Sequence, residues 1–239
     1  MKKLLLSFLF VAASASIVVA QKTINDLNVE KRTVGSFHGI DVGTGIELML
    51  TEGSTEELAV SAATTELRDK IVTKVENGIL KIQYETKMGS INKIKETKDL
   101  KAYVSYKILD LLDANTGAEV KISGVLKSAS LDLKANTGAL VEGEVDITSL
   151  KISQNTGSKV TLSGKADKLD IDGDTGSKFK GEDLVTSNCN VTVSTGAIVS
   201  VKAEKELQAK ANTGGSVKYK GSPAIKEIKT HTGGSVTKI

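Results

Sequence analysis

Apolar and polar residues alternate along most of this chain, and one dipeptide organises the alternation. Thr-Gly recurs with steps between 18 residues (213 − 195) and 21 residues (137 − 116). The copies begin at Thr116, Thr137, Thr156, Thr175, Thr195, Thr213 and Thr232. The residues four before and four after each Thr are apolar, and those between are mostly polar. A period of two predicts strands with one buried face, and a step near 20 residues predicts a repeat architecture.

The residue before each Thr is short and polar in all copies but the last, which carries histidine. The column reads Asn115, Asn136, Asn155, Asp174, Ser194, Asn212 and His231. Asn and Gly tolerate the left-handed backbone that a sharp corner needs, and stacked side chains at this position can form a hydrogen-bonded ladder. A second glycine closes five copies, 6 or 8 residues after Thr: Gly124, Gly143, Gly164, Gly181 and Gly221.

These patterns predict an all-β parallel β-helix, or β-solenoid, with about seven regular coils of ~19–20 residues and an irregular N-terminal part. Leucine-rich repeats have a similar period, but they need a denser leucine pattern. Helical repeats need a period of 3.6 residues, which the chain lacks. Scarce aromatic residues (four Phe, four Tyr, no Trp) fit a narrow interior filled by aliphatic side chains.

The organisation that we predict has four parts. Residues 1–20 read as a signal peptide, with Lys2 and Lys3 before an apolar run and small residues before Gln21; the alternative is an uncleaved anchor. Residues 21–36 form an extended arm, residues 37–105 an irregular β region, and residues 106–239 the regular coils. The irregular region either covers the first coil or consists of early coils with insertions.

Local signals refine the irregular region. Thr44-Gly45 looks like a degenerate first copy, and residues 65–70 favour one helical turn. Asn77-Gly78 between two alternating runs predicts a hairpin with a type I′ turn. The lysine-rich segment 88–99 is expected to be a mobile loop. The last copy ends at Ile239, and its strand edges predict self-association through the C-terminal coil.

The segments 37–42, 46–53 and 75–82, taken with the Asn-Thr-Gly-Ala corners, resemble the head GIN domain family of putative auto-transporter adhesins. These are exported bacterial proteins of the cell envelope. The resemblance covers residues 33–239 and implies a right-handed β-helix with an adhesive role. It supplies no catalytic residues.

The best candidate for chemistry is an acidic row formed by Asp170, Asp172 and Asp174. Residues at i, i+2 and i+4 share one face of a strand, and outward carboxylates on a β-helix can bind a cation or act as acid and base. A solvated strand face with a corner Asp in place of Asn explains the row more simply. Lys134, Lys151 and Lys210 occupy outward positions nearby, and Asp132 is placed in an adjacent column.

The other reactive residues point to structural roles. Cys189 stands in a column otherwise filled by leucine, which indicates a buried small apolar residue. His231 is a variant of the corner ladder, and His38 is expected to be structural or exposed. No phosphate-binding loop or zinc-ligand cluster appears, so we expect no cofactor.

Charge narrows the choice of partners. The formal net charge is +3, and the lysines are scattered without interleaved aromatics, which excludes a nucleic-acid surface. We therefore predict an exported, non-enzymatic, adhesin-like or envelope interaction module of the periplasm, outer-membrane surface or extracellular space. The alternatives are a carbohydrate-active enzyme of the polysaccharide lyase or hydrolase type and a periplasmic scaffold that binds another envelope protein.

Overall fold

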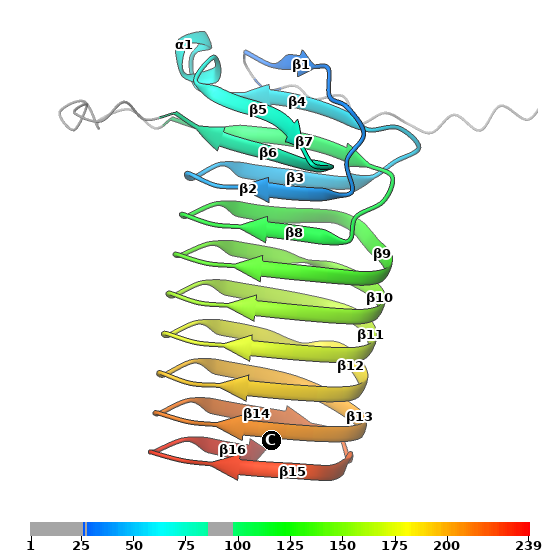
Figure 1. The fold of residues 1–239 in the computed structure, drawn as a ribbon, viewed down its shortest axis with the longest axis vertical. Coiled ribbons are helices and arrows are strands. Elements are labelled where there is room, and N and C mark those ends of the chain that lie inside the picture. The colour runs from blue at the N-terminus through cyan, green and yellow to red at the C-terminus, as the bar shows by residue number, and fades with distance from the viewer. Residues whose placement is uncertain (1–25, 27, 86–97) are drawn as a thin grey trace, which may run out of the picture.

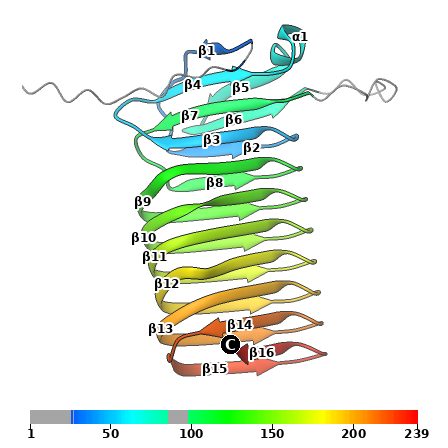
Figure 2. The ribbon, with the colours of Figure 1, turned by 180° about the vertical axis from the view of Figure 1, so that it is seen from behind.

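The chain winds into a flat coil of stacked strands (Figures 1 and 2). This computed structural model describes residues 26, 28–85 and 98–239. The N-terminal elements are β1 (Glu30–Arg32), β2 (Gly39–Val42), β3 (Glu47–Glu52), β4 (Glu57–Ser61), α1 (Thr65–Arg68), β5 (Ile71–Glu76), β6 (Ile79–Tyr84) and β7 (Lys101–Tyr106). The coils follow as β8 (Leu111–Ala114), β9 (Glu119–Ala135), β10 (Leu140–Gln154), β11 (Lys159–Gly173), β12 (Lys178–Val193), β13 (Ile198–Ala211), β14 (Ser216–Lys220), β15 (Ala224–Thr230) and β16 (Ser235–Lys238).

Long strands make up the body of the molecule. Each of β9 to β13 runs from one corner, round a bend, to the next corner (Figure 1). Each pairs in parallel with the strand one coil away, so that like residues stack, as Leu150 on Leu169 and Ile152 on Ile171. Because the side-chain period is two, these stacked residues all point into the tube, where they are buried. The predicted β-solenoid of about seven regular coils is confirmed.

The corners are tight turns with a left-handed backbone at both central residues. Thr116 has a φ of 48° and Gly117 a φ of 72°, and the amide of Ala118 donates to the carbonyl of Asn115 at 3.0 Å. This is the pattern of a type I′ turn, which needs positive φ at its two central positions. The sequence predicts a left-handed residue at Asn or Gly. In the structure it is at Thr and Gly, because Asn occupies the first position of the turn, where φ is ordinary.

The second glycines have two different causes. Gly124, Gly164 and Gly221 lie eight residues after Thr and have φ between 80° and 98°, a backbone that favours glycine. Gly143 and Gly181 lie six residues after Thr and are needed for space. A Cβ at Gly143 would approach the Cβ of Ile122, one coil away, to 2.5 Å. The sequence pattern is therefore the same for glycines that the backbone conformation requires and for glycines that only the packing requires.

The N-terminal region contains one true coil and a cover. β2 and β3 flank the corner at Thr44 and Gly45, which has the same left-handed backbone as the later corners. This coil stacks directly on the next one, β2 on β8 and β3 on β9. On its other side lie β6, which pairs with β2, and β7, which pairs with β3.

The cover closes the upper end of the solenoid with antiparallel strands. β4 pairs antiparallel with β7, and β1 pairs antiparallel with β4. The predicted hairpin is confirmed as β5 and β6, joined by Asn77 (φ 52°) and Gly78 (φ 74°), and the predicted helical turn is α1. The predicted signal peptide lies outside the described residues, as does most of the expected loop 88–99.

Candidate functional site

The corner column, in which we expected a ladder of side chains, is held mainly by the backbone. The amide of Asn136 donates to the carbonyl of Ala114, and the same bond repeats at every later corner. A side-chain bond between neighbouring corners joins Ser194 Oγ to Asp174 Oδ1 at 2.8 Å. Asn115 instead donates to Asp41 Oδ1 at 3.0 Å, in the first coil. Asn155 turns back to accept from the amide of Thr156, within its own corner.

The acidic row lies on the outside of β11 and the corner that follows it, with its three carboxylates in different surroundings. Asp170 Oδ1 accepts from Asn190 Nδ2 at 3.1 Å, on the next coil. Asp172 is exposed. Asp174 accepts from hydroxyl groups at the next corner and from the amide of Thr175; these bonds lower its pKa. Asp170 and Asp174 are thus engaged as structural acceptors.

Lysine separates the acids that could have formed a larger cluster. Asp132 does not occupy an adjacent column: it lies in the same column as Asp170, two coils away, with Lys151 between them. In the neighbouring column, Lys134 stacks on Ser153, which stacks on Asp172. Among the described residues, no group of three or more His, Cys, Asp or Glu side chains is placed to hold a metal ion.

The outer face is covered by ion pairs and hydrogen bonds, many of which run between coils. Lys210 pairs with Glu227 at 3.3 Å, and Gln208 donates to the same carboxylate at 3.0 Å. Lys220 reaches Glu182 at 3.0 Å. Exposed pairs of this kind contribute little to stability because solvent screens them, so their main effect is to fix side chains in a regular array.

The two histidines and the single cysteine are far from a catalytic arrangement. His38 Nδ1 lies 2.6 Å from Asp110 Oδ1, and both side chains are half exposed. His231 is exposed at the last corner. Cys189 is buried between Leu169 and Leu207, and burial raises the pKa of its thiol to about 12. The thiol is therefore protonated at neutral pH and acts as a core side chain.

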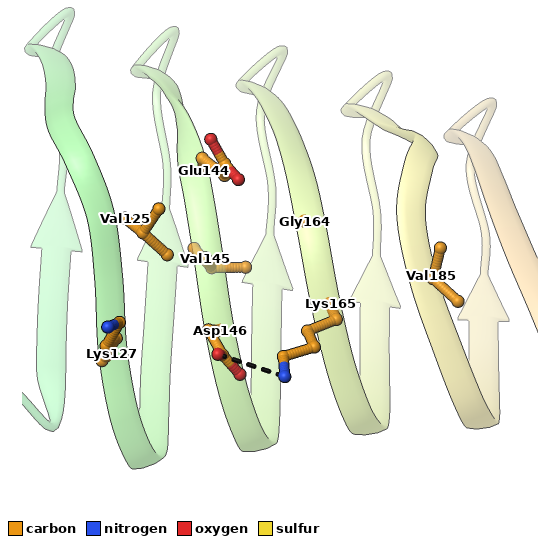
Figure 3. A pocket seen from close by; sticks show the side chains of 8 residues that line it. All are labelled: Val125, Lys127, Glu144, Val145, Asp146, Gly164, Lys165 and Val185. Atoms are coloured by element: carbon orange, nitrogen blue, oxygen red, sulfur yellow. Dashed lines mark ion pairs between the residues drawn. The ribbon is translucent and has the colours of Figure 1, made fainter.

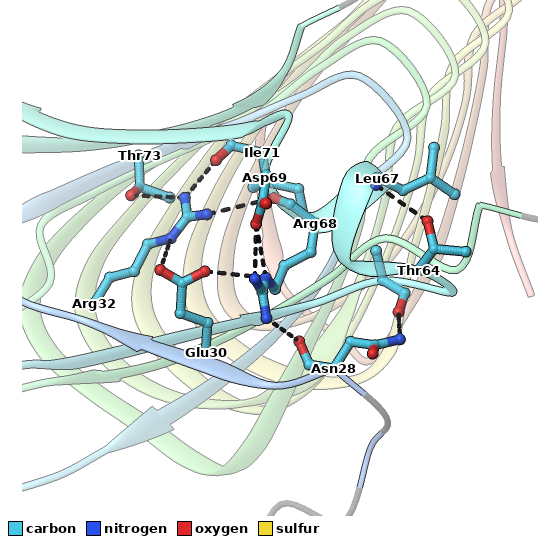
Figure 4. A network of polar contacts seen from close by, with 10 residues as sticks. Asn28, Glu30, Arg32, Thr64, Leu67, Arg68, Asp69, Ile71 and Thr73 are labelled. Carbon is cyan, nitrogen blue, oxygen red and sulfur yellow. Dashed lines mark hydrogen bonds and ion pairs between the residues drawn. The ribbon is translucent and has the colours of Figure 1, made fainter.

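A polar network that sequence reasoning missed ties the N-terminal arm to the cover (Figure 4). Glu30 on β1 pairs with Arg68 at 3.0 Å and with Arg32 at 3.7 Å. Arg68 also donates to the carbonyl of Asn28, and Arg32 donates to the carbonyl of Ile71. Arg32 and Arg68 are the chain's only arginines, and that scarcity was the available signal. The network fastens the cover, because forked guanidinium groups can bond several acceptors at once.

A shallow depression on the outside of the bend was also missed (Figure 3). We call it the bend ledge and define it by eight residues from β9 to β12: Val125, Lys127, Glu144, Val145, Asp146, Gly164, Lys165 and Val185. Its floor is apolar, and Lys165 pairs with Asp146 at 3.2 Å along one side. Gly164 belongs to the ledge because its left-handed backbone passes so close to Val145 that a Cβ would lie 2.2 Å from the carbonyl oxygen of Val145.

The fold and these surfaces define a class: a filled β-solenoid whose usable surface is its outside. In the part of the chain that the structure describes, no helix has the length and apolar character needed to cross a membrane. The chain belongs to the family described as putative auto-transporter adhesin, head GIN domain, which it matches over residues 36–223.

Solved structures share this fold. A putative adhesin from Bacteroides fragilis has a TM-score of 0.76 at 19% identity, over 88% of this chain and 95% of that one. A putative adhesin from Parabacteroides merdae has a TM-score of 0.70 at 16% identity, over 90% and 97%. A protein from Parabacteroides distasonis described as a putative lipid binding protein has a TM-score of 0.65 at 20% identity, over 88% and 96%. No curated protein matches the chain.

Proposed function

We propose that this protein is an exported, non-enzymatic module of the cell envelope that works by adhesive contact through the outside of its solenoid. The observation that carries the proposal is the filled interior. The stacked aliphatic residues of the coils, such as Leu133, Ile152 and Ile171, are fully buried and leave the outer surface for recognition. The family description and the two neighbouring adhesins agree with such a role.

The bend ledge is the contact that we assign to this function. On the flat faces, many charged side chains are paired with one another, as Lys210 is with Glu227, so a partner there would have to break some of these pairs. At the ledge, Val125 and Val185 present apolar surface beside the Lys165–Asp146 pair. Burying apolar surface contributes about 25 cal/mol per Å², so a partner that covers the ledge gains free energy by displacing water from it.

Localisation tests the exported, adhesive role. In fractionated cells of the producing bacterium, we expect the protein in the envelope fraction and, on intact cells, cleavage by added protease. Protection from protease until the outer membrane is opened would instead establish the periplasmic scaffold. Recovery in the cytoplasm would overturn the proposal altogether.

Binding tests the assigned contact. Purified protein carrying Lys165→Glu and Val185→Asp should be retained less than the unchanged protein on intact bacterial cells and on immobilised extracellular-matrix protein. Lys168→Glu is the matched control, because Lys168 lies on the same strand, three residues away, and stacks between uncharged Ser149 and Asn188. Equal retention of all three proteins would exclude the ledge as the contact.

A further inference from the structure

The two ends of the solenoid are built differently. The N-terminal end is closed by β1, β4 and α1 (Figure 1). At the other end, β15 pairs with β13 and β16 pairs with β14, and in the described chain the outer edges of β15 and β16 have no partner. The core side chains there are uncovered: Ile225 is 45% exposed and Ile228 43%, whereas Leu207 and Ala209, one coil earlier, are fully buried. An open strand edge with apolar side chains is a site for pairing with another strand.

We propose that two copies of this protein associate end to end through β15, which pairs antiparallel with β15 of the second copy about a two-fold axis at Ile228. A second copy is the occupant that fits, because β15 and β16 are edges of opposite faces of the coil, and another C-terminal end offers the same two edges. The N-terminal end of another copy fits less well, since its outermost strand on the β4 face is β1, which has only three residues, all of them charged. A two-fold axis joins identical surfaces and closes after two copies.

The backbone directions support an axis at Ile228. The amide of His231 donates to the carbonyl of Ala211, so it points toward β13. Main-chain groups alternate in direction along a strand, so those of Lys229 point the same way, and those of Ile228 and Thr230 point out from the edge. With the axis at Ile228, the two Ile228 residues exchange both of their N–H···O=C bonds.

Charge selects this register over its neighbours. An axis at Ile228 places Glu227 opposite Lys229 of the second copy, and Lys229 opposite its Glu227. An axis at Glu227 or at Lys229 would place like charges directly opposite each other, which destabilises a sheet. The Ile228 side chain continues the buried column of Val191 and Ala209, so the pairing also covers the exposed isoleucine.

Cysteine substitutions test the register directly. Ile228→Cys should form a disulfide-linked dimer under mild oxidation, because residues opposite each other in an antiparallel pair have Cα atoms about 4.5–5.5 Å apart, within the range of a disulfide. Thr230→Cys is the matched control on the same side of the strand. The two copies of residue 230 lie on opposite sides of the axis at Ile228, too far apart to form a disulfide, so no link should form. Linking at both positions, or at neither, would overturn the proposed register.

Charge reversal tests the same contact without a new covalent bond. Glu227→Lys should weaken dimerisation by about tenfold, as measured by light scattering over a range of concentrations. Adding Lys229→Glu to that variant should restore the dimer, because the swapped charges again face their opposites, and circular dichroism should show an unchanged fold. A wild-type protein that remains monomeric at every concentration would refute the proposed dimer. This result would not bear on the proposed adhesive function, which the binding experiment tests separately.

Discussion

Phe179 fills the space that Gly181 leaves free. A Cβ at Gly181 would lie 2.4 Å from Cε1 of the Phe179 ring. Both residues belong to inward columns. The other coils carry residues smaller than Phe at the first position, and the next coil carries Val199 and Val201 in place of this pair. The large ring at position 179 thus fills the volume that a side chain at position 181 would otherwise occupy, as close packing of a narrow interior requires.

This exchange predicts strong coupling between the two positions. Gly181→Ala alone should destabilise the protein by about 1–3 kcal/mol through overpacking against the ring. Phe179→Val alone should also destabilise it, by leaving a cavity. The double variant should lose less than the sum of the two, by about 0.5–3 kcal/mol, when unfolding free energies are measured in urea. If the losses of stability in the two single variants simply add in the double variant, the Phe179 ring is not the reason for glycine at position 181.

Threonine in a left-handed backbone predicts a stabilising substitution. Thr137 has a φ of 50°, and a β-branched residue there is strained by about 1 kcal/mol or more. Thr137→Asn should therefore raise the free energy of unfolding by about 1 kcal/mol, since Asn tolerates this conformation. Thr148→Asn, at an exposed position within β10, is the control and should be neutral or slightly destabilising. A loss of stability at Thr137 would mean that its side chain makes a contribution larger than the strain.

Replacing Asp113 with a neutral residue should stabilise the protein, by an amount that depends on pH. Burial, with Asp41 nearby, raises the pKa of this carboxyl group, and its Oδ1 has no hydrogen-bond partner among the residues that the structure describes. The folded state therefore holds a proton at a pH where the unfolded state has lost it, so stability falls as pH rises through the raised pKa. Asp113→Asn should increase the melting temperature at pH 7 and change it little at pH 3.

The control for Asp113 lies in the same column. Asp172→Asn removes an exposed carboxylate from that column, two coils further on than Lys134, and should change the melting temperature little at either pH. Equal effects of the two substitutions would show that net charge, and not burial, governs the response.

We predict that the Cys189 thiol reacts only when the protein unfolds. Because burial raises its pKa to about 12, the native protein should resist iodoacetamide at pH 8, and labelling should follow unfolding in urea. The unfolded thiol ionises at a lower pH than the folded one, so Cys189 makes the protein less stable as pH rises between those two values. Rapid labelling of the native protein, followed by mass spectrometry, would contradict this placement.

Much of the coil geometry could be predicted from the sequence, because it depends on local rules. Period-two alternation determined which face of each strand is buried, and Thr-Gly marked the corners. The shared column of Cys189 and Leu169 was read from spacing alone and corresponds to stacked residues. The acidic row was predictable as a row, but its engagement by Asn190 and Ser194 was not, because those bonds cross from one coil to the next.

What only the tertiary structure decided is the order in which distant segments stack. The coil of β2 and β3 lies between β6 and β7 on one side and β8 and β9 on the other, so the spatial order departs from the chain order. A strand's pattern specifies its buried face but not which parallel neighbour it joins, since backbone hydrogen bonds are the same for every sequence. The bend ledge and the open edge of β15 also depend on the tertiary structure. The ledge forms where residues of β9 to β12 lie side by side, and the open edge is the side of β15 that pairs with no strand of the described chain.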